Sequence, residues 1–170
     1  MKIILASKSP RRKEILNMLN IDFKIIKSGF NEKTIGDIEP IDYCMNSAIG
    51  KASHVSSKYP QSYVIGADTV VYYNKKILGK PKDRSQANKY LQLLNNSNHE
   101  VYTGVSIVNK DKSIKKKFYE KTIVTFNNVN QKDINFYIDK YKPYDKAGSY
   151  GIQEWSSIFF IKILLHSCIP

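Results

Sequence analysis

The hydrophobic pattern predicts strands that alternate with helices along the chain. Short apolar or alternating runs are typical of strands, and they occur at residues 3–6, 22–27, 63–71, 77–78, 99–109 and 115–127. Apolar residues at helical spacing predict four helices, which begin near Pro10, Pro40, Asp83 or Ser85, and Asn130 or Gln131. The polar turn 110–113 joins two long strands as a β-hairpin. This order predicts an α/β fold with α+β elements, a mixed twisted sheet flanked by helices.

The first predicted helix follows a serine-rich turn. Ser9 is the expected N-cap and Pro10 the first helical residue, because proline is preorganised for that position. The apolar residues Ile15, Leu16 and Leu19 predict that one face of this helix packs inward.

The composition of this turn also predicts phosphate binding. Backbone N–H groups at a helix N-terminus attract anions, and Ser7, Ser9, Arg11 and Arg12 lie beside them. Two arginines at a helix N-terminus oppose the helix dipole, so an exposed first-turn pair is the weaker interpretation. Since the planar guanidinium suits phosphate oxygens, we expect an anion between the arginines and the backbone.

Asp68 is the most informative single residue. It interrupts an apolar strand and would destabilise the fold if it were buried without partners. It is either a strand-end residue that caps nearby backbone or a carboxylate at the edge of a cleft that binds a metal ion or activates water. Glu32, in the loop before the second helix, is a candidate second ligand for Mg²⁺ or Mn²⁺.

Length and composition indicate a globular protein. A chain of 170 residues with 42% hydrophobic residues suits one domain, or two small lobes that share one sheet. We expect no membrane span and no signal peptide, and therefore a cytoplasmic protein. Cys44 and Cys168 have no metal-ligand spacing and are expected to be free thiols.

The net charge of +12 does not by itself indicate a nucleic-acid-binding protein. Of the 27 basic residues only Arg11, Arg12 and Arg84 are arginine, and the lysines are spread along the chain. A solvated lysine surface is therefore the preferred interpretation, and no specific nucleic acid is expected as a partner.

Together these features describe a cleft that holds two arginines, the lysines Lys51 and Lys80, and two carboxylates. Such a cleft suits metal-assisted attack of water on a nucleotide polyphosphate, because cations neutralise the phosphates while a carboxylate takes the proton. The residues alone choose neither the base nor the bond that breaks.

Six motifs, in order, resemble those of the Maf family of nucleotide pyrophosphatases. They are LASKSPRR (5–12), SAIGKA (47–52), GADTVV (66–71), LGKP (78–81), HEVYTGV (99–105) and DKAGSYGIQ (145–153). The resemblance implies one Maf-like domain over residues 1–170, an ITPase-like fold with a cleft between two lobes, and often a homodimer.

The resemblance also implies hydrolysis of a nucleoside triphosphate between its α- and β-phosphates, with a divalent cation. Asp68 would accept the proton, and Glu32 would join it at the metal. The family pattern places the phosphate contacts on Ser7, Ser9, Arg11, Arg12, Lys51 and Lys80. Arg11, Thr69 and Gln153 match the residues that mark the dTTP/UTP branch, and glutamine and threonine suit the carbonyl and imide edge of a pyrimidine.

Two other functions stay open at this point. One is a pyrophosphatase that acts on 7-methyl-GTP, and the other is a non-enzymatic regulator of septum formation and cell division.

The sequence also departs from the family pattern. Asn31 replaces a common Asp, Glu154 replaces a Gly and adds a charge near the base pocket, and the chain from about residue 163 is atypical. A truncation or frame change there is a hypothesis, and it would expose apolar surface or a sheet edge.

Overall fold

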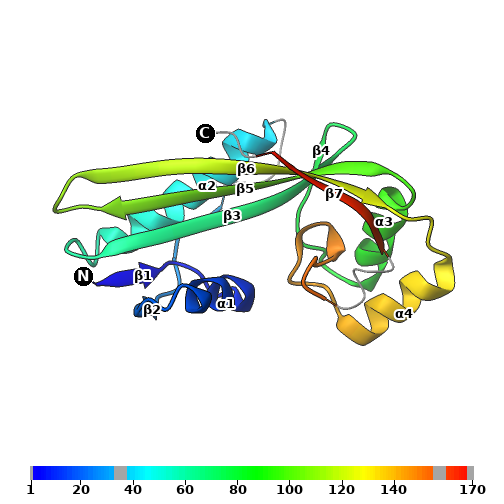
Figure 1. Cartoon of the computed structure of the whole chain (residues 1–170), viewed down its shortest axis with the longest axis horizontal. Coiled ribbons are helices and arrows are strands. Elements are labelled where there is room, and N and C mark those ends of the chain that lie inside the picture. The colour runs from blue at the N-terminus through cyan, green and yellow to red at the C-terminus, as the bar shows by residue number, and fades with distance from the viewer. Residues whose placement is uncertain (1, 33–37, 155–159, 168–170) are drawn as a thin grey trace. The chain divides into compact units, whose positions relative to one another are not determined.

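The computed structural model describes residues 2–32, 38–154 and 160–167, and within them seven strands and four α-helices form (Figure 1). The strands are β1 (Ile3–Leu5), β2 (Phe23–Ile25), β3 (Tyr63–Tyr73), β4 (Lys76–Leu78), β5 (Asn98–Asn109), β6 (Ile114–Phe126) and β7 (Ile161–Ser167). The helices are α1 (Pro10–Met18), α2 (Pro40–Ser56), α3 (Arg84–Leu94) and α4 (Gln131–Tyr141), with a short 3₁₀ helix η1 (Ala147–Ser149).

The strands form one mixed sheet, as the sequence predicts. Their order is β2-β1-β3-β5-β6-β7, and β4 pairs with β3 outside this path. Strand β1 is parallel to both β2 and β3, whereas β4 is antiparallel to β3 and β7 is antiparallel to β6. The parallel pairs need crossover connections, and helices α1 and α2 lie in the segments that link these strands.

The chain divides into two compact units that each take part of this sheet. The first consists mainly of Met1–Asp68 and Thr103–Tyr119, and the second of Thr69–Tyr102 and Glu120–Ile169. Strands β3, β5 and β6 each contribute residues to both units. The single Maf-like domain over residues 1–170 stays a prediction.

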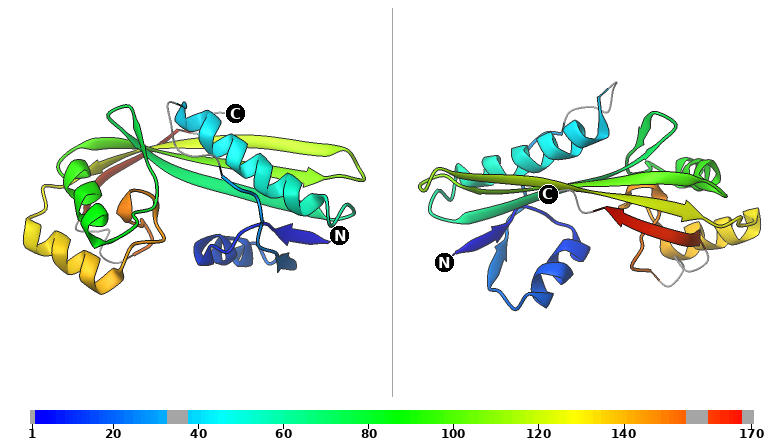
Figure 2. Two further views of the ribbon diagram at one scale, coloured as in Figure 1. Left: turned by 180° about the vertical axis from the view of Figure 1, so that it is seen from behind. Right: turned by 45° about the horizontal axis from the view of Figure 1, so that its top comes forward.

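In the first unit, helix α2 packs directly on strands β3 and β5 (Figure 2). The buried cluster beneath it joins Ala52 and Val55 of the helix to Val64 of β3 and Val108 of β5. At Gly66 the approach is so close that a Cβ would lie 2.3 Å from the Ala48 carbonyl oxygen. The backbone of α2 is therefore held against the strand that carries Asp68.

In the second unit, helices α3 and α4 form the core with one face of the sheet. Leu91 and Leu94 of α3 and Ile138 of α4 are fully buried with Phe126 of β6. Both helices begin with the expected cap. The Asp83 carboxylate accepts a hydrogen bond from the Gln86 N–H at 2.7 Å, and the Asn130 side chain accepts one from the Asp133 N–H at 2.9 Å.

Helix α1 differs from the prediction in two respects. Ile15 is 50% and Leu19 62% exposed, and only Leu16 is buried. Arg12 and Leu16, which are four residues apart, lie on the inward face of the helix. The helix ends before Leu19. Ser9 occupies the N-cap position as predicted, but its side chain makes no capping hydrogen bond.

Strand β7 is the last strand in the sheet order, and it exposes apolar side chains. Ile163, Leu164 and Leu165 are 45%, 45% and 60% exposed. The apolar exposure that the atypical sequence predicts is therefore present over these residues. Residues 158, 159 and 168–170 of this region lie outside the described residues.

Two further expectations concern the cysteines and the membrane. Cys44 is a buried free thiol, and burial raises its pKa to about 12; Cys168 lies outside the described residues. None of the described helices combines the length and apolar character that a membrane crossing requires.

The packing of α2 on β3 predicts the effect of adding one methyl group. Gly66→Ala is expected to lower the free energy of unfolding by about 2–3 kcal/mol, because the new Cβ meets the helix backbone, which cannot move aside cheaply. Urea unfolding measures this. The matched control is Gly29→Ala, whose Cβ would meet only the end of the His54 ring, and we expect a change within about 0.5 kcal/mol. Equal stability of both variants would contradict the close approach.

Candidate active site

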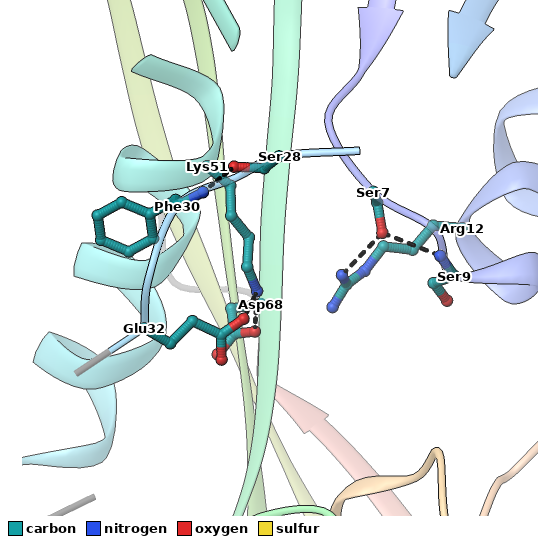
Figure 3. Close-up of polar contacts among 8 residues, drawn as sticks. All are labelled: Ser7, Ser9, Arg12, Ser28, Phe30, Glu32, Lys51 and Asp68. Carbon is teal, nitrogen blue, oxygen red and sulfur yellow. Dashed lines mark hydrogen bonds and ion pairs between the residues drawn. The ribbon is translucent and has the colours of Figure 1, made fainter. Parts of the chain in front are cut away.

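The centre of the candidate site is an ion pair between Asp68 and Lys51 (Figure 3). The Asp68 Oδ1 atom lies 2.6 Å from the Lys51 Nζ atom, and the two side chains are only 12% and 13% exposed. Asp68 comes from β3 and Lys51 from α2. The structure therefore gives the buried carboxylate a partner, as its burial requires.

Lys51 holds a second carboxylate. Glu32 Oε1 lies 2.7 Å from the same Nζ atom, and the Glu32 side chain is 45% exposed. The preceding loop is fixed by the Phe30 N–H, which donates to Ser28 Oγ at 3.1 Å, and by the Phe30 ring, which lies where a side chain at Gly50 would lie. A loop glutamate is thus held at the helix that carries Lys51.

Burial raises the pKa of the Asp68 carboxyl above its ordinary value. The Lys51 ammonium acts in the opposite direction, through its charge and its hydrogen bond, and so does the Arg12 charge, whereas Glu32 raises the pKa further. Loss of hydration therefore outweighs the ion pair, and the carboxylate is a stronger base than an exposed aspartate.

A second group of side chains lies at the N-terminus of α1. Ser7 Oγ accepts hydrogen bonds from the Ser9 N–H at 3.1 Å and from Arg12 Nη1 at 3.3 Å. Arg12 extends toward β3 in Figure 3, and the charges of Asp68 and Glu32 act on its pKa. Burial nevertheless lowers the Arg12 pKa overall. Arg11 is half-buried beside it.

The structure therefore brings six predicted residues together in the first unit: Ser7, Ser9, Arg12, Glu32, Lys51 and Asp68. Arg11 is their neighbour in sequence. Their roles in binding and catalysis stay predictions.

The other predicted residues belong to the second unit. Thr69 follows Asp68 on β3 and is half-buried. Lys80 is exposed, and its neighbours fix its backbone, because Pro81 is buried and the Gly79 carbonyl accepts a hydrogen bond from the Gly148 N–H at 3.1 Å. Gln153 is exposed in a turn.

The turn that carries Gln153 contains an ion pair that the sequence analysis did not find. Glu154 Oε1 lies 2.8 Å from Lys146 Nζ, and Glu154 Oε2 accepts a hydrogen bond from the Tyr137 hydroxyl at 2.7 Å. The additional charge of Glu154 is thus paired inside the second unit. In a lysine-rich chain nothing in the sequence distinguishes Lys146 from the other lysines. Lys146 and Glu154 are eight residues apart across a loop, so their pairing follows neither the helix period nor the strand period.

Tyr43 of α2 was also missed. It is buried, and burial raises its pKa, with Glu32 and Asp68 acting in the same direction. It lies about two helical turns before Lys51 on α2, a relation that is found only by projecting the whole helix onto a wheel.

The carboxylates fit the metal that the sequence predicts. Glu32 and Asp68 converge on one ammonium group, so their oxygens lie close together, and carboxylate oxygens are the ligands that Mg²⁺ and Mn²⁺ prefer. The described residues hold no cluster of three or more His, Cys, Asp or Glu side chains. Mg²⁺ commonly binds with one or two carboxylates and substrate phosphates, so two suffice.

The model of the Maf-like protein family matches residues 2–168. The chain belongs to this family. Among its Maf-like relatives, the dTTP/UTP pyrophosphatase of Bacillus cytotoxicus is 49% identical over 159 residues, which are 93% of this chain and 82% of the relative. The dTTP/UTP pyrophosphatases of Bacillus anthracis and Bacillus cereus are 50% identical over the same shares of each chain.

Solved structures support the fold of this Maf-like chain. The Ham1 protein of Staphylococcus aureus has a TM-score of 0.51 at 15% sequence identity and is similar over 90% of this chain and 88% of its own. A HAM1 protein from Coxiella burnetii has a TM-score of 0.50 at the same identity and coverage. The mixed α/β fold is thereby confirmed.

The raised pKa of Asp68 predicts how stability depends on pH. Between the ordinary aspartate pKa of about 3.9 and the raised value, the folded state binds more protons than the unfolded state. Wild-type protein therefore loses stability relative to Asp68→Asn as the pH rises through this window. We expect Asp68→Asn to be the more stable protein at neutral pH, with a difference that shrinks toward pH 4.

Urea unfolding of both proteins from pH 4 to pH 8 measures this difference. Asp139→Asn is the matched control, because the exposed Asp139 carboxylate has a pKa lowered by Arg84 and should show no gain at neutral pH. Lower stability of Asp68→Asn at neutral pH would mean that the ion pair outweighs the loss of hydration.

Proposed function

We propose that this Maf-like chain is a pyrophosphatase that hydrolyses dTTP and UTP to the monophosphate and pyrophosphate. The observation that carries the proposal is the buried Asp68 carboxylate, held by Lys51 beside Glu32 and Arg12. Relatives that are 49–50% identical over 93% of the chain are named dTTP/UTP pyrophosphatases, which supports this choice of substrate.

In this proposal the first unit holds the phosphates. Ser7, Ser9, Arg11 and Arg12 stand at the N-terminus of α1, where the helix dipole favours an anion. The Ser7 hydroxyl orients the Arg12 guanidinium, whose planar donors match phosphate oxygens. The partial burial of Arg12 strengthens its attraction for an anion, because less water competes for it.

Asp68 accepts the proton of the attacking water. Water adds across the anhydride between the α- and β-phosphates, so the P–O–P bridge breaks, one new P–O bond forms and the released proton passes to a carboxylate oxygen. A base is more effective when its pKa lies nearer the working pH, and burial shifts Asp68 in that direction. Lys51 fixes the carboxylate in one orientation.

Glu32 and Asp68 would hold a divalent cation, Mg²⁺ or Mn²⁺, together with the substrate phosphates. When bound, the cation neutralises negative charge that develops on the phosphate oxygens. Glu32 suits this task because its side chain is 45% exposed and one of its oxygens already lies at Lys51.

Selection of a pyrimidine is assigned to Arg11, Thr69 and Gln153, and a further phosphate contact to Lys80. Gln153 is exposed in its turn, and the Lys80 backbone is fixed between Gly79 and the buried Pro81. Glutamine and threonine can hydrogen-bond the carbonyl and imide groups of uracil or thymine. The homodimer and the cytoplasmic location stay predictions.

Removal of the base is expected to abolish the reaction. Asp68→Asn should lower kcat for dTTP and UTP by about 10²–10⁴-fold, because an amide cannot accept the proton. The measurement is pyrophosphate release from dTTP, UTP, CTP, 7-methyl-GTP and dITP with Mg²⁺ or Mn²⁺. Asp139→Asn, an exposed carboxylate-to-amide change, should keep wild-type rates.

Two results of this panel would contradict the proposal. Wild-type turnover of 7-methyl-GTP in place of dTTP and UTP would refute the assigned selectivity. Full activity of Asp68→Asn would refute its role as the base.

The phosphate contact of Arg12 is tested by a change that keeps its charge. Arg12→Lys should lower kcat/KM for dTTP by about 10–100-fold, since lysine cannot make the bidentate contact and loses the hydrogen bond to Ser7. Arg84→Lys is the control, because Arg84 is exposed and pairs only with Asp139 among the contacts described for it. If the two variants had the same kcat/KM, Arg12 would not bind phosphate.

A further inference from the structure

The segment that carries Gln153 is anchored by an ion pair directly after that residue. Glu154, directly after Gln153, pairs with Lys146 at 2.8 Å and accepts the Tyr137 hydroxyl at 2.7 Å. Each oxygen of the Glu154 carboxylate thus has its own donor. Lys146 also lies 3.0 Å from the Asp145 carboxylate, and its side chain is 8% exposed. A buried ammonium between two carboxylates holds its partners firmly, because separation would leave it unpaired.

The other side of the turn packs on the same lysine. A Cβ at Gly151 would lie 3.1 Å from Lys146 Cε and 3.2 Å from Cδ, so the lysine stem passes directly under the glycine. The Glu154 N–H reaches back to the Gly151 carbonyl at 3.4 Å. Gly151 and Glu154, which flank the exposed Ile152 and Gln153, are therefore both held at Lys146.

Helix α4 provides the rigid support for this arrangement. Tyr137 is 2% exposed, stacks on Tyr141 with ring centroids 5.3 Å apart and meets the Phe160 ring edge-on at 5.0 Å. Its hydroxyl is therefore fixed by the hydrophobic core. The turn inherits this rigidity through Glu154, whose carboxylate joins Tyr137 to Lys146.

We propose that Glu154 is a positioning residue that fixes the turn carrying Gln153, through Lys146 and Tyr137, and thereby sets the discrimination between pyrimidines. The inference rests on the proposed function, since it needs Gln153 at the base. The charge of Glu154 takes no part in the proposed hydrolysis, and the inference gives this side chain a positioning role.

The test compares Glu154→Ala and Glu154→Gln with wild type in two independent measurements. In steady-state kinetics, Glu154→Ala should raise KM for dTTP about tenfold and leave kcat within about twofold, because Gln153 contributes binding that is equal in ground and transition states. Its preference for dTTP over dCTP should fall by a similar factor. Glu154→Gln keeps one acceptor, so its KM and its preference should lie between those of wild type and Glu154→Ala.

In hydrogen–deuterium exchange, the amides of residues 152–154 should exchange about tenfold faster in Glu154→Ala, since the turn then opens more often. Asp139→Asn is the matched control for both measurements. It removes an exposed carboxylate from α4, the helix that carries Tyr137, and should leave KM, preference and exchange unchanged.

A merely structural role for Glu154 would lower the melting temperature of Glu154→Ala without changing KM or preference, and that result would overturn the inference. If Glu154→Ala does not fold, Glu154→Gln decides by the same criteria. Wild-type protein without dTTP or UTP turnover would refute the proposed function, and the role in pyrimidine discrimination with it. Wild-type turnover with unchanged Glu154 variants would refute the inference alone.

Discussion

Helix α2 lies so close to strands β3 and β5 that Gly66 and Gly104 have no room for a Cβ atom. The Cβ of Gly66 would meet the Ala48 carbonyl oxygen at 2.3 Å, and that of Gly104 would meet the Cys44 carbonyl oxygen at 2.8 Å. Contact between backbones fixes a helix more tightly than contact between flexible side chains, because backbone atoms cannot change rotamer. The position of Lys51, and therefore of its ion pairs with Asp68 and Glu32, depends on this contact.

The two backbone periods explain why Lys51 meets Asp68. Side chains alternate along a strand, so Gly66 and Asp68 share the face of β3 that α2 covers. Residues three and four apart share a helix face, so Lys51 follows Ala48 toward the strand. Gly66, which permits the close packing, is therefore two residues away from Asp68, the carboxylate that needs a partner. Glu32 also reaches Lys51, because its loop is held by the Phe30 ring, which occupies the free space at Gly50.

The sequence predicts the elements well and the pairings poorly. Apolar periodicity and cap residues place the strands and helices, and an acid within an apolar strand singles out Asp68. The partners come from tertiary contacts that have no local signature. Glu154 looked like an added charge, yet it pairs with Lys146 and Tyr137. Of the three apolar residues that predicted the inward face of α1, only Leu16 is buried, and it shares that face with Arg12, which donates to Ser7.

The charges at the candidate site bear on the divalent cation of the proposed function. Arg12 and Lys51 lie with two carboxylates, Glu32 and Asp68, and Arg11 next to Arg12 in the chain adds a third cation, so these five residues carry one net positive charge. A nucleoside triphosphate carries more negative charge than this surplus can neutralise. A divalent cation on the two carboxylates would supply the remaining positive charge at the phosphates, and Lys51 would keep the carboxylates together until it arrives. In the proposed function, Lys51 would therefore serve the site both with and without substrate.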